Sequence, residues 1–99
     1  MNGAASPDDG LDVRRRRTRF RAWHRGMREM DLILGRFADA EIARLSEAEI
    51  DAFEALMEEQ DRDLFAWLTG ELPLAMRADT PFFHKLAAFT GAMPRSVDR

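Results

Sequence analysis

Apolar side chains recur at steps of three and four residues through most of this 99-residue chain, and this spacing restricts its fold more than any other feature. Residues three or four apart share one side of an α-helix, whereas a half-buried β-strand requires strict alternation. No segment of the sequence shows convincing alternation. The pattern therefore predicts an all-α protein, a compact bundle of four or five short helices around one core.

The first two predicted helices are separated by a glycine. The first covers about residues 13–24 and stops before Gly26, because a glycine inside a helix costs about 1 kcal/mol relative to alanine. The second covers about residues 27–45. Gly35 lies inside this second pattern, and for the same reason it favours an interruption there.

Capping residues mark the remaining helices. Ser46–Glu49 has the sequence of a capping box and begins the third helix. Asp61 is the expected N-cap of a short fourth helix, which Gly70 ends. Residues 71–79 contain a proline and are predicted to form a loop. Thr80–Pro81 then supplies an N-cap and a first-turn proline for a fifth helix, which runs toward Gly91.

The expected core residues share one face of each helix. They are, in chain order, Phe20, Trp23, Met27, Met30, Ile33, Leu34, Phe37, Ile50, Phe53, Leu56, Met57, Leu64, Phe65, Trp67, Leu68, Phe82, Phe83, Leu86, Ala87 and Phe89. This places one helical domain at residues 13–91, with a disordered extension at residues 1–12 and a flexible tail at residues 92–99.

The chain start has no apolar core and contains two acids, so it resembles neither a secretory signal nor a mitochondrial presequence. No apolar run approaches the roughly 20 residues that cross a bilayer. The absence of cysteine excludes disulfides and zinc–thiolate sites. We therefore expect a cytoplasmic bacterial protein with no membrane contact, or one of the mitochondrial matrix if the source is eukaryotic.

Charge is distributed unevenly along the chain. Residues 13–28 contain eight arginines and no acid, whereas residues 39–63 contain ten acids and two arginines. The acidic face of the third helix is expected to be a solvated surface. The arginine-rich helix could neutralise phosphates, which leaves a nucleic-acid-binding regulator as the alternative function. The acidic remainder of the chain would be repelled by a polyanion, so we expect the arginine-rich helix to contact an acidic protein surface instead.

Enzyme chemistry finds little support in this sequence. A nucleophile requires a positioned base, but His24 and His84 lie in different predicted helices with no serine partner. Neither has a second ligand at metal-binding spacing, and His84 is expected at the surface. The six glycines never cluster into a phosphate-binding loop. We expect no catalytic residue, no metal and no stably bound cofactor.

The segment from Arg25 to Asp31 is the strongest candidate for a contact site. Arg25 and Glu29 are four residues apart and could be neighbours across the helix start. Gly26, which has no side chain, would let the backbone of a partner approach closely. Acids in a first helical turn are also favoured by the helix dipole. That effect explains Glu29 and Asp31, but neither Gly26 nor the flanking arginines.

Two motifs in this order resemble the succinate dehydrogenase assembly factors that promote covalent FAD attachment. The first is Arg-Gly-x-x-Glu at residues 25–29, extended by Met30 and Asp31. The second is Asp-x-x-Leu-x-x-Trp at residues 61–67, followed by Gly70. The resemblance covers about residues 17–91. At His24, many family members have another arginine.

The resemblance implies a non-enzymatic factor, monomeric when free. It would bind the flavoprotein subunit of succinate dehydrogenase, and of fumarate reductase as a possible second client, and act on FAD held by that partner. The partner-binding residues that it implies are Arg21, His24, Arg25, Gly26, Arg28, Glu29 and Asp31. A generic helical adaptor for some other protein is a further alternative.

Overall fold

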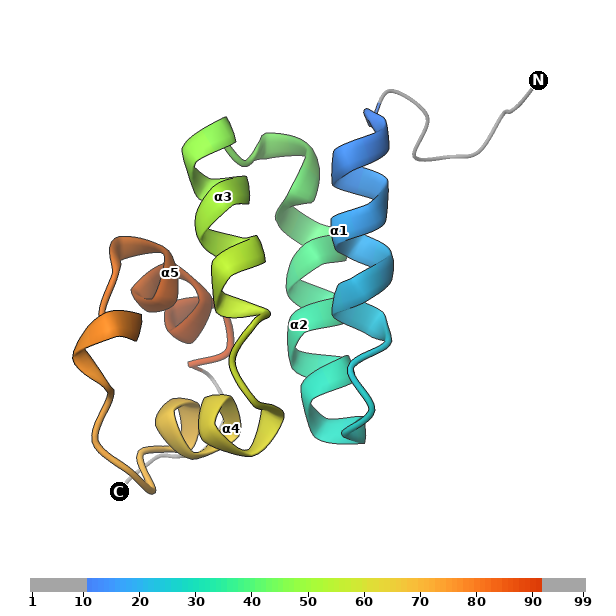
Figure 1. Ribbon diagram of the computed structural model, residues 1–99. Helices are drawn as coiled ribbons and strands as arrows, with labels where there is room; N and C mark the ends of the chain where they lie inside the picture. The colour runs from blue at the N-terminus through green and yellow to red at the C-terminus, as the bar shows by residue number, and fades with distance from the viewer. Residues whose placement is uncertain (1–10, 92–99) are drawn as a thin grey trace.

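Five α-helices and two short 3-10 turns make up residues 11–91, the part of the chain that the computed structural model describes (Figure 1). The elements are α1 Val13–Trp23, α2 Arg28–Glu41, η1 Ile42–Arg44, α3 Glu47–Leu56, α4 Asp61–Thr69, η2 Met76–Ala78 and α5 Pro81–Phe89. The all-α prediction is confirmed. The predicted disorder of residues 1–10 and flexibility of residues 92–99 concern parts of the chain outside the described residues.

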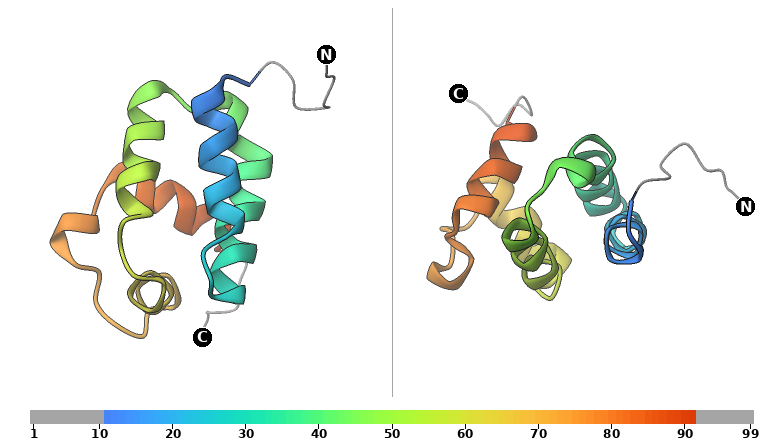
Figure 2. Two further views of the ribbon diagram at one scale, coloured as in Figure 1. Left: turned by 45° about the vertical axis from the view of Figure 1, so that its right-hand side comes forward. Right: turned by 90° about the horizontal axis from the view of Figure 1, so that it is seen from above.

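The first three helices run up and down beside one another. Figure 1 shows α4 crossing below the end of α3, with α5 behind α3. Seen from above in Figure 2, α1 lies at one edge of the molecule and α5 at the other, with α2 and α3 between them. One side of α1 therefore faces away from the remaining helices.

Three of the predicted helix boundaries are confirmed in their capping interactions. Ser46 and Glu49 form the reciprocal capping box at the start of α3. Gly70 ends α4 in the left-handed conformation, with φ of +81°. The Thr80 side chain accepts a hydrogen bond from the Phe83 amide at 3.1 Å, and proline occupies the first turn of α5. Local sequence therefore determines these boundaries.

The N-cap predicted for α4 is wrong by one position. Gln60 is the N-cap, and Asp61 is the first residue of the helix. The Asp61 carboxylate does not cap the helix, because it binds Arg25 from the α1–α2 corner. The ion pair with Arg25, which is distant in the sequence, therefore occupies the carboxylate that local capping rules would assign to the helix start.

Other boundaries also shift slightly. Asp12 caps α1 by accepting a hydrogen bond from the Arg15 amide at 2.8 Å, so the folded part begins before residue 13. The second helix stays unbroken through Gly35 but ends at Glu41, where η1 follows. The predicted loop at residues 71–79 contains the short turn η2.

Aromatic rings from three helices meet at the centre of the core. Phe37 on α2 is fully buried and packs edge-to-face against Phe53, Phe82 and Phe89, with ring centroids 5.6, 5.5 and 5.3 Å away. Such contacts stabilise by about 0.5–1.5 kcal/mol beyond area burial. This cluster joins α2, α3 and α5, and it confirms the predicted core face of α2.

The predicted apolar face of α1 is wrong in part. Phe20 is 61% exposed, and the buried residues of α1 are Thr18 and Ala22. Trp23 is half-buried, with its ring over Gly35 of α2. The Trp23 ring covers Gly35, which has no side chain, so α1 and α2 approach closely there, and Phe20 faces outward.

Candidate functional site

The Arg-Gly-x-x-Glu segment forms a tight corner between α1 and α2. His24 is the C-cap of α1, and Gly26 has φ of +105°, a conformation that side-chain-bearing residues rarely adopt. An Asp31 carboxylate oxygen accepts hydrogen bonds from the backbone amides of Arg25 and Gly26, at 2.5 and 3.3 Å. Asp31 therefore holds the corner closed from the first turn of α2.

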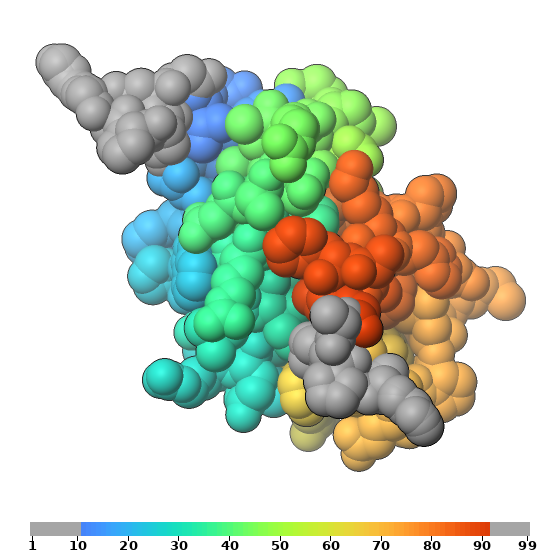
Figure 3. All heavy atoms as spheres, turned by 180° about the vertical axis from the view of Figure 1, so that it is seen from behind, coloured from blue at the N-terminus to red at the C-terminus, as the bar shows by residue number. Residues whose placement is uncertain are grey.

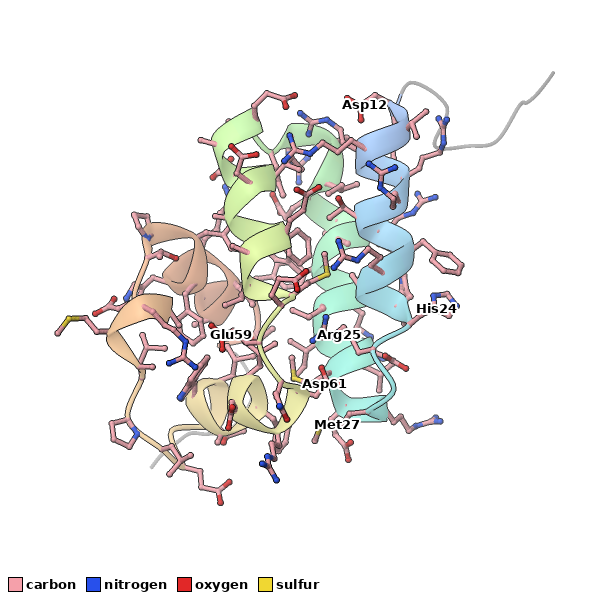
Figure 4. All side chains as sticks on the ribbon, in the orientation of Figure 1. Asp12, His24, Arg25, Met27, Glu59 and Asp61 are labelled. Atoms are coloured by element: carbon pink, nitrogen blue, oxygen red, sulfur yellow. The ribbon has the colours of Figure 1, made fainter. Side chains whose placement is uncertain are left out.

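Arg25 binds the connection between α3 and α4. Its Nε donates to the Asp61 carboxylate at 2.8 Å, and its terminal nitrogens donate to the carbonyls of Met57 and Glu59 at 2.6 and 2.9 Å. The Arg25 and Asp61 side chains are only 12% and 18% exposed. Figure 4 shows Arg25 directed inward toward Asp61 and Glu59. Its guanidinium therefore makes contacts within the protein and does not point into solvent.

The expected neighbour relation between Arg25 and Glu29 is therefore wrong. The guanidinium of Arg25 is used by Asp61 and two carbonyls, and Glu29 lies exposed on α2. Gly26 and Arg28 are exposed as well. A Cβ atom at Gly26 would meet nothing within 4 Å, so the space beside this glycine is open. The corner thus presents Gly26, Arg28 and Glu29 outward.

Two other predicted contact residues make interactions within the chain. A terminal nitrogen of Arg21 lies 3.2 Å from a carboxylate oxygen of Glu58. The ring of His24 stacks on Phe20 with centroids 4.0 Å apart, and its Nδ1 lies 2.7 Å from the Phe20 carbonyl oxygen. Figure 4 shows His24 on the side of α1 away from α3. His24 remains exposed, beside the corner.

A shallow apolar groove of about 400 Å³ lies beside Glu29. Its walls come from Glu29, Leu32, Ile33 and Arg36 of α2, Phe65 of α4 and Phe89 of α5. Figure 3 shows the surfaces of α2, α4 and α5 meeting on the face seen from behind. This groove is not predictable from the sequence alone, although residues 29, 32, 33 and 36 have the spacing of one helix face.

The acidic face of α3 is an ion-pairing surface for α1, so the expectation of a purely solvated face is wrong. Arg14 binds Glu54 through two nitrogens, at 2.8 and 2.9 Å, and also contacts Glu47 and Asp51. Arg15 donates to the Ile42 and Leu45 carbonyls at 2.7 Å each. Much of the charge imbalance along the sequence is thus neutralised within the fold.

This pairing changes the pKa of Glu54. The hydrogen bonds from Arg14 hold the pKa of the Glu54 carboxyl below its usual value, and the positive charge of Arg14 acts in the same direction. The same contact raises the pKa of the Arg14 guanidinium. Arginines held by carboxylates are poor ligands for phosphates, so Arg14 gives little support to the nucleic-acid alternative.

Residues 11–91 contain no cluster of histidine, aspartate or glutamate suited to a metal ion. None of the helices described there has the length and apolar character needed to cross a bilayer. His84 is exposed, as expected, and its Nε2 lies 2.6 Å from an Asp79 oxygen.

Residues 16–90 match the family described as flavinator of succinate dehydrogenase. The chain belongs to this family. The predicted family relationship is therefore confirmed, and the match includes both motifs and the groove.

Relatives of this flavinator-family protein occur in bacteria and in mitochondria. It is 38% identical over 79 residues to the FAD assembly factor SdhE of Acetobacter pasteurianus, covering 80% of this chain and 72% of that one. It is 48% identical over 46 residues to SdhE of Legionella pneumophila strain Lens, covering 46% and 58%. To the mitochondrial succinate dehydrogenase assembly factor 2 of Debaryomyces hansenii it is 36% identical over 61 residues, covering 62% and 43%.

Proposed function

We propose that this protein binds the flavoprotein subunit of succinate dehydrogenase and assists covalent attachment of FAD to that subunit. Family membership supports this proposal. The observation that carries it is the corner between α1 and α2, which directs Gly26, Arg28 and Glu29 into open space. The flavin chemistry belongs to FAD and to the subunit, and this protein supplies positioning.

Each exposed corner residue has a distinct role in this proposal. Gly26 leaves room for the backbone of the partner, Arg28 donates hydrogen bonds to acidic or carbonyl groups, and Glu29 accepts them from basic groups. The groove beside Glu29 accommodates an apolar side chain of the same partner. Together these contacts would hold the flavin domain and the mobile capping domain of the subunit in a reactive arrangement.

Arg25 and Asp31 act indirectly in this proposal. Asp31 holds the backbone of the corner, and Arg25 fastens that corner to the start of α4. They therefore position Gly26, Arg28 and Glu29 without contacting the partner through their charged groups. Arg21 and His24 lie beside the corner, at the margin of the proposed contact.

Co-expression with the subunit tests the proposal in cells lacking their own assembly factor. Covalent flavin is read as fluorescence of the denatured subunit on a gel. We expect fluorescence with the wild type and a strong loss with Glu29→Gln, which removes the charge but keeps the shape. Glu71→Gln is the matched control, because Glu71 is an exposed acid on the loop after α4.

The result that overturns the proposal is equal fluorescence in the presence and absence of the wild-type protein. Equal fluorescence with wild type and with Glu29→Gln would exclude the assigned contact. The same assay with the flavoprotein subunit of fumarate reductase tests whether that subunit is a second client. The far-UV circular dichroism spectrum of each variant verifies that the helices remain folded.

A further inference from the structure

The outward face of α1 carries exposed apolar side chains that the fold does not use. Val13 and Phe20 are 63% and 61% exposed. They share this face with Arg17 and His24, because residues 13, 17, 20 and 24 are spaced by four, three and four. Figure 2 shows α1 at an edge of the molecule, with the other helices on its opposite side. We call Val13, Arg16, Arg17, Phe20 and His24 the α1 outer face.

The two sides of α1 differ in what neutralises their arginines. On the inner side, Arg14 and Arg21 bind carboxylates of α3. On the outer face, Arg16 donates to the carbonyl of Leu11 at 2.5 Å. A carbonyl carries no net charge, so this contact does not neutralise the guanidinium. Arg17 is exposed and pairs with no acid within residues 11–91. The outer face is therefore both basic and apolar.

The ring of Phe20 is also held in place. Its stacking on His24, with centroids 4.0 Å apart and planes 20° apart, restricts both side chains. The Nδ1 contact of His24 with the Phe20 carbonyl fixes the pair further. An exposed aromatic ring with few conformations loses little entropy on binding, which is a property of residues that anchor interfaces.

We propose that the α1 outer face is a second docking surface, which binds an acidic region of the flavoprotein subunit that carries an exposed apolar side chain. Arg16 and Arg17 select the acidic character of the partner, and Val13 and Phe20 select the apolar side chain. This inference rests on the proposed function and extends its contact area. From His24 beside the corner, the face runs along α1 for about 16 Å to Val13.

A protein surface fits these residues better than a polyanion does. Nucleic acid would need many cations, and the inner arginines of α1 are already bound to α3. An anionic membrane would also need a larger basic patch, whereas the protein as a whole has a net charge of −3. Burial of Val13 and Phe20 instead requires an apolar counterpart, and proteins supply it at defined positions.

The test measures binding of the full-length protein to the purified flavoprotein subunit at two salt concentrations. We expect Phe20→Ala to weaken binding about ten-fold at both concentrations, because its contribution is mainly apolar. Arg17→Glu should weaken binding about ten-fold or more in low salt and much less in 0.5 M salt, because screening reduces exposed charge interactions. Both variants should retain the helical spectrum and thermal stability of the wild type.

Matched controls separate the α1 outer face from general surface effects. Leu72→Ala removes an apolar side chain that is 49% exposed on a different part of the surface. Arg44→Glu makes the same charge change at an arginine 71% exposed in η1. Neither control should change the affinity more than about two-fold.

Several outcomes would overturn the inference. If Phe20→Ala and Arg17→Glu bind like the wild type while Glu29→Gln loses binding, the inference fails and the proposed function stands. If the wild type does not bind the subunit at all, the inference and the proposed function both fail. The inference also fails if Arg17→Glu abolishes adsorption to anionic vesicles or to duplex DNA but leaves subunit binding unchanged.

Discussion

Arg25 and Asp61 lie 36 residues apart in the chain and form an ion pair, with Nε and Oδ1 separated by 2.8 Å. Each is the first residue of one of the two family motifs. The same guanidinium binds carbonyls at the end of α3, so one side chain joins the α1–α2 corner to the α3–α4 connection. The two motifs are therefore parts of one structural unit, in which the second supports the first.

Loss of this ion pair should lower the stability of the protein. Removing one partner of a fully buried pair costs about 3–5 kcal/mol, and this pair is slightly exposed, so we expect Arg25→Ala to cost about 2–3 kcal/mol. Urea unfolding followed by circular dichroism measures this change. A double-mutant cycle with Asp61→Ala should show a coupling of at least about 1 kcal/mol. Strictly additive effects would contradict the pairing.

Gly35→Ala should destabilise the protein although alanine favours helices. A Cβ at Gly35 would lie 2.2 Å from the Trp23 ring, which must then move. Overpacking costs about 1–3 kcal/mol and the helix propensity of alanine returns about 1 kcal/mol, so we expect a net loss of up to about 2 kcal/mol in urea unfolding.

The Trp23→Ala background is the control for Gly35→Ala. Without the indole ring the clash disappears, and the helix propensity of alanine alone should make Gly35→Ala stabilising there. A destabilisation of equal size in both backgrounds would show that the Trp23 contact is not its cause.

Acid should weaken the contact between α1 and α3. Because the hydrogen bonds from Arg14 lower the pKa of the Glu54 carboxyl below its ordinary value of 4.5, the folded state binds this proton more weakly than the unfolded state. The contribution of Glu54 to stability is then complete above about pH 4.5 and is lost as the pH falls through the lower folded pKa. Thermal unfolding between pH 7 and pH 3 measures this loss.

Arg14→Gln is the matching variant for the acid experiment. This substitution removes the hydrogen bonds that lower the pKa of Glu54. The melting temperature of the variant should therefore fall less steeply below pH 4.5 than that of the wild type. Parallel pH profiles for the two proteins would show that Glu54 is not responsible. Glu71→Gln, on the exposed loop, should follow the wild-type profile.

Ser46→Ala should destabilise the start of α3. The Ser46 hydroxyl accepts a hydrogen bond from the Glu49 amide at 3.1 Å, and loss of such an N-cap costs about 1 kcal/mol. Urea unfolding should show this loss, whereas Ser46→Asp, which also caps, should remain near the wild type. Equal destabilisation by both substitutions would contradict the capping role.

Sequence alone determined the secondary structure and most of the core. Helical spacing and capping rules are local, since each depends on residues within about one turn of one another. The boundaries at Ser46, Gly70 and Thr80 were therefore predictable, as was burial of Phe37. The two motifs also identified the family, because their residues and order could be read directly from the chain.

Tertiary structure alone decided which charged groups remain free. Arg25 was predicted at the surface of the corner, but Asp61 and two carbonyls far away in the sequence bind it. The acidic face of α3 was predicted to be solvated, but Arg14 and Arg21 bind it. Close approach of Trp23 to Gly35 left Phe20 outside. Ion pairs and packing depend on how helices meet in space, and no local rule specifies that meeting.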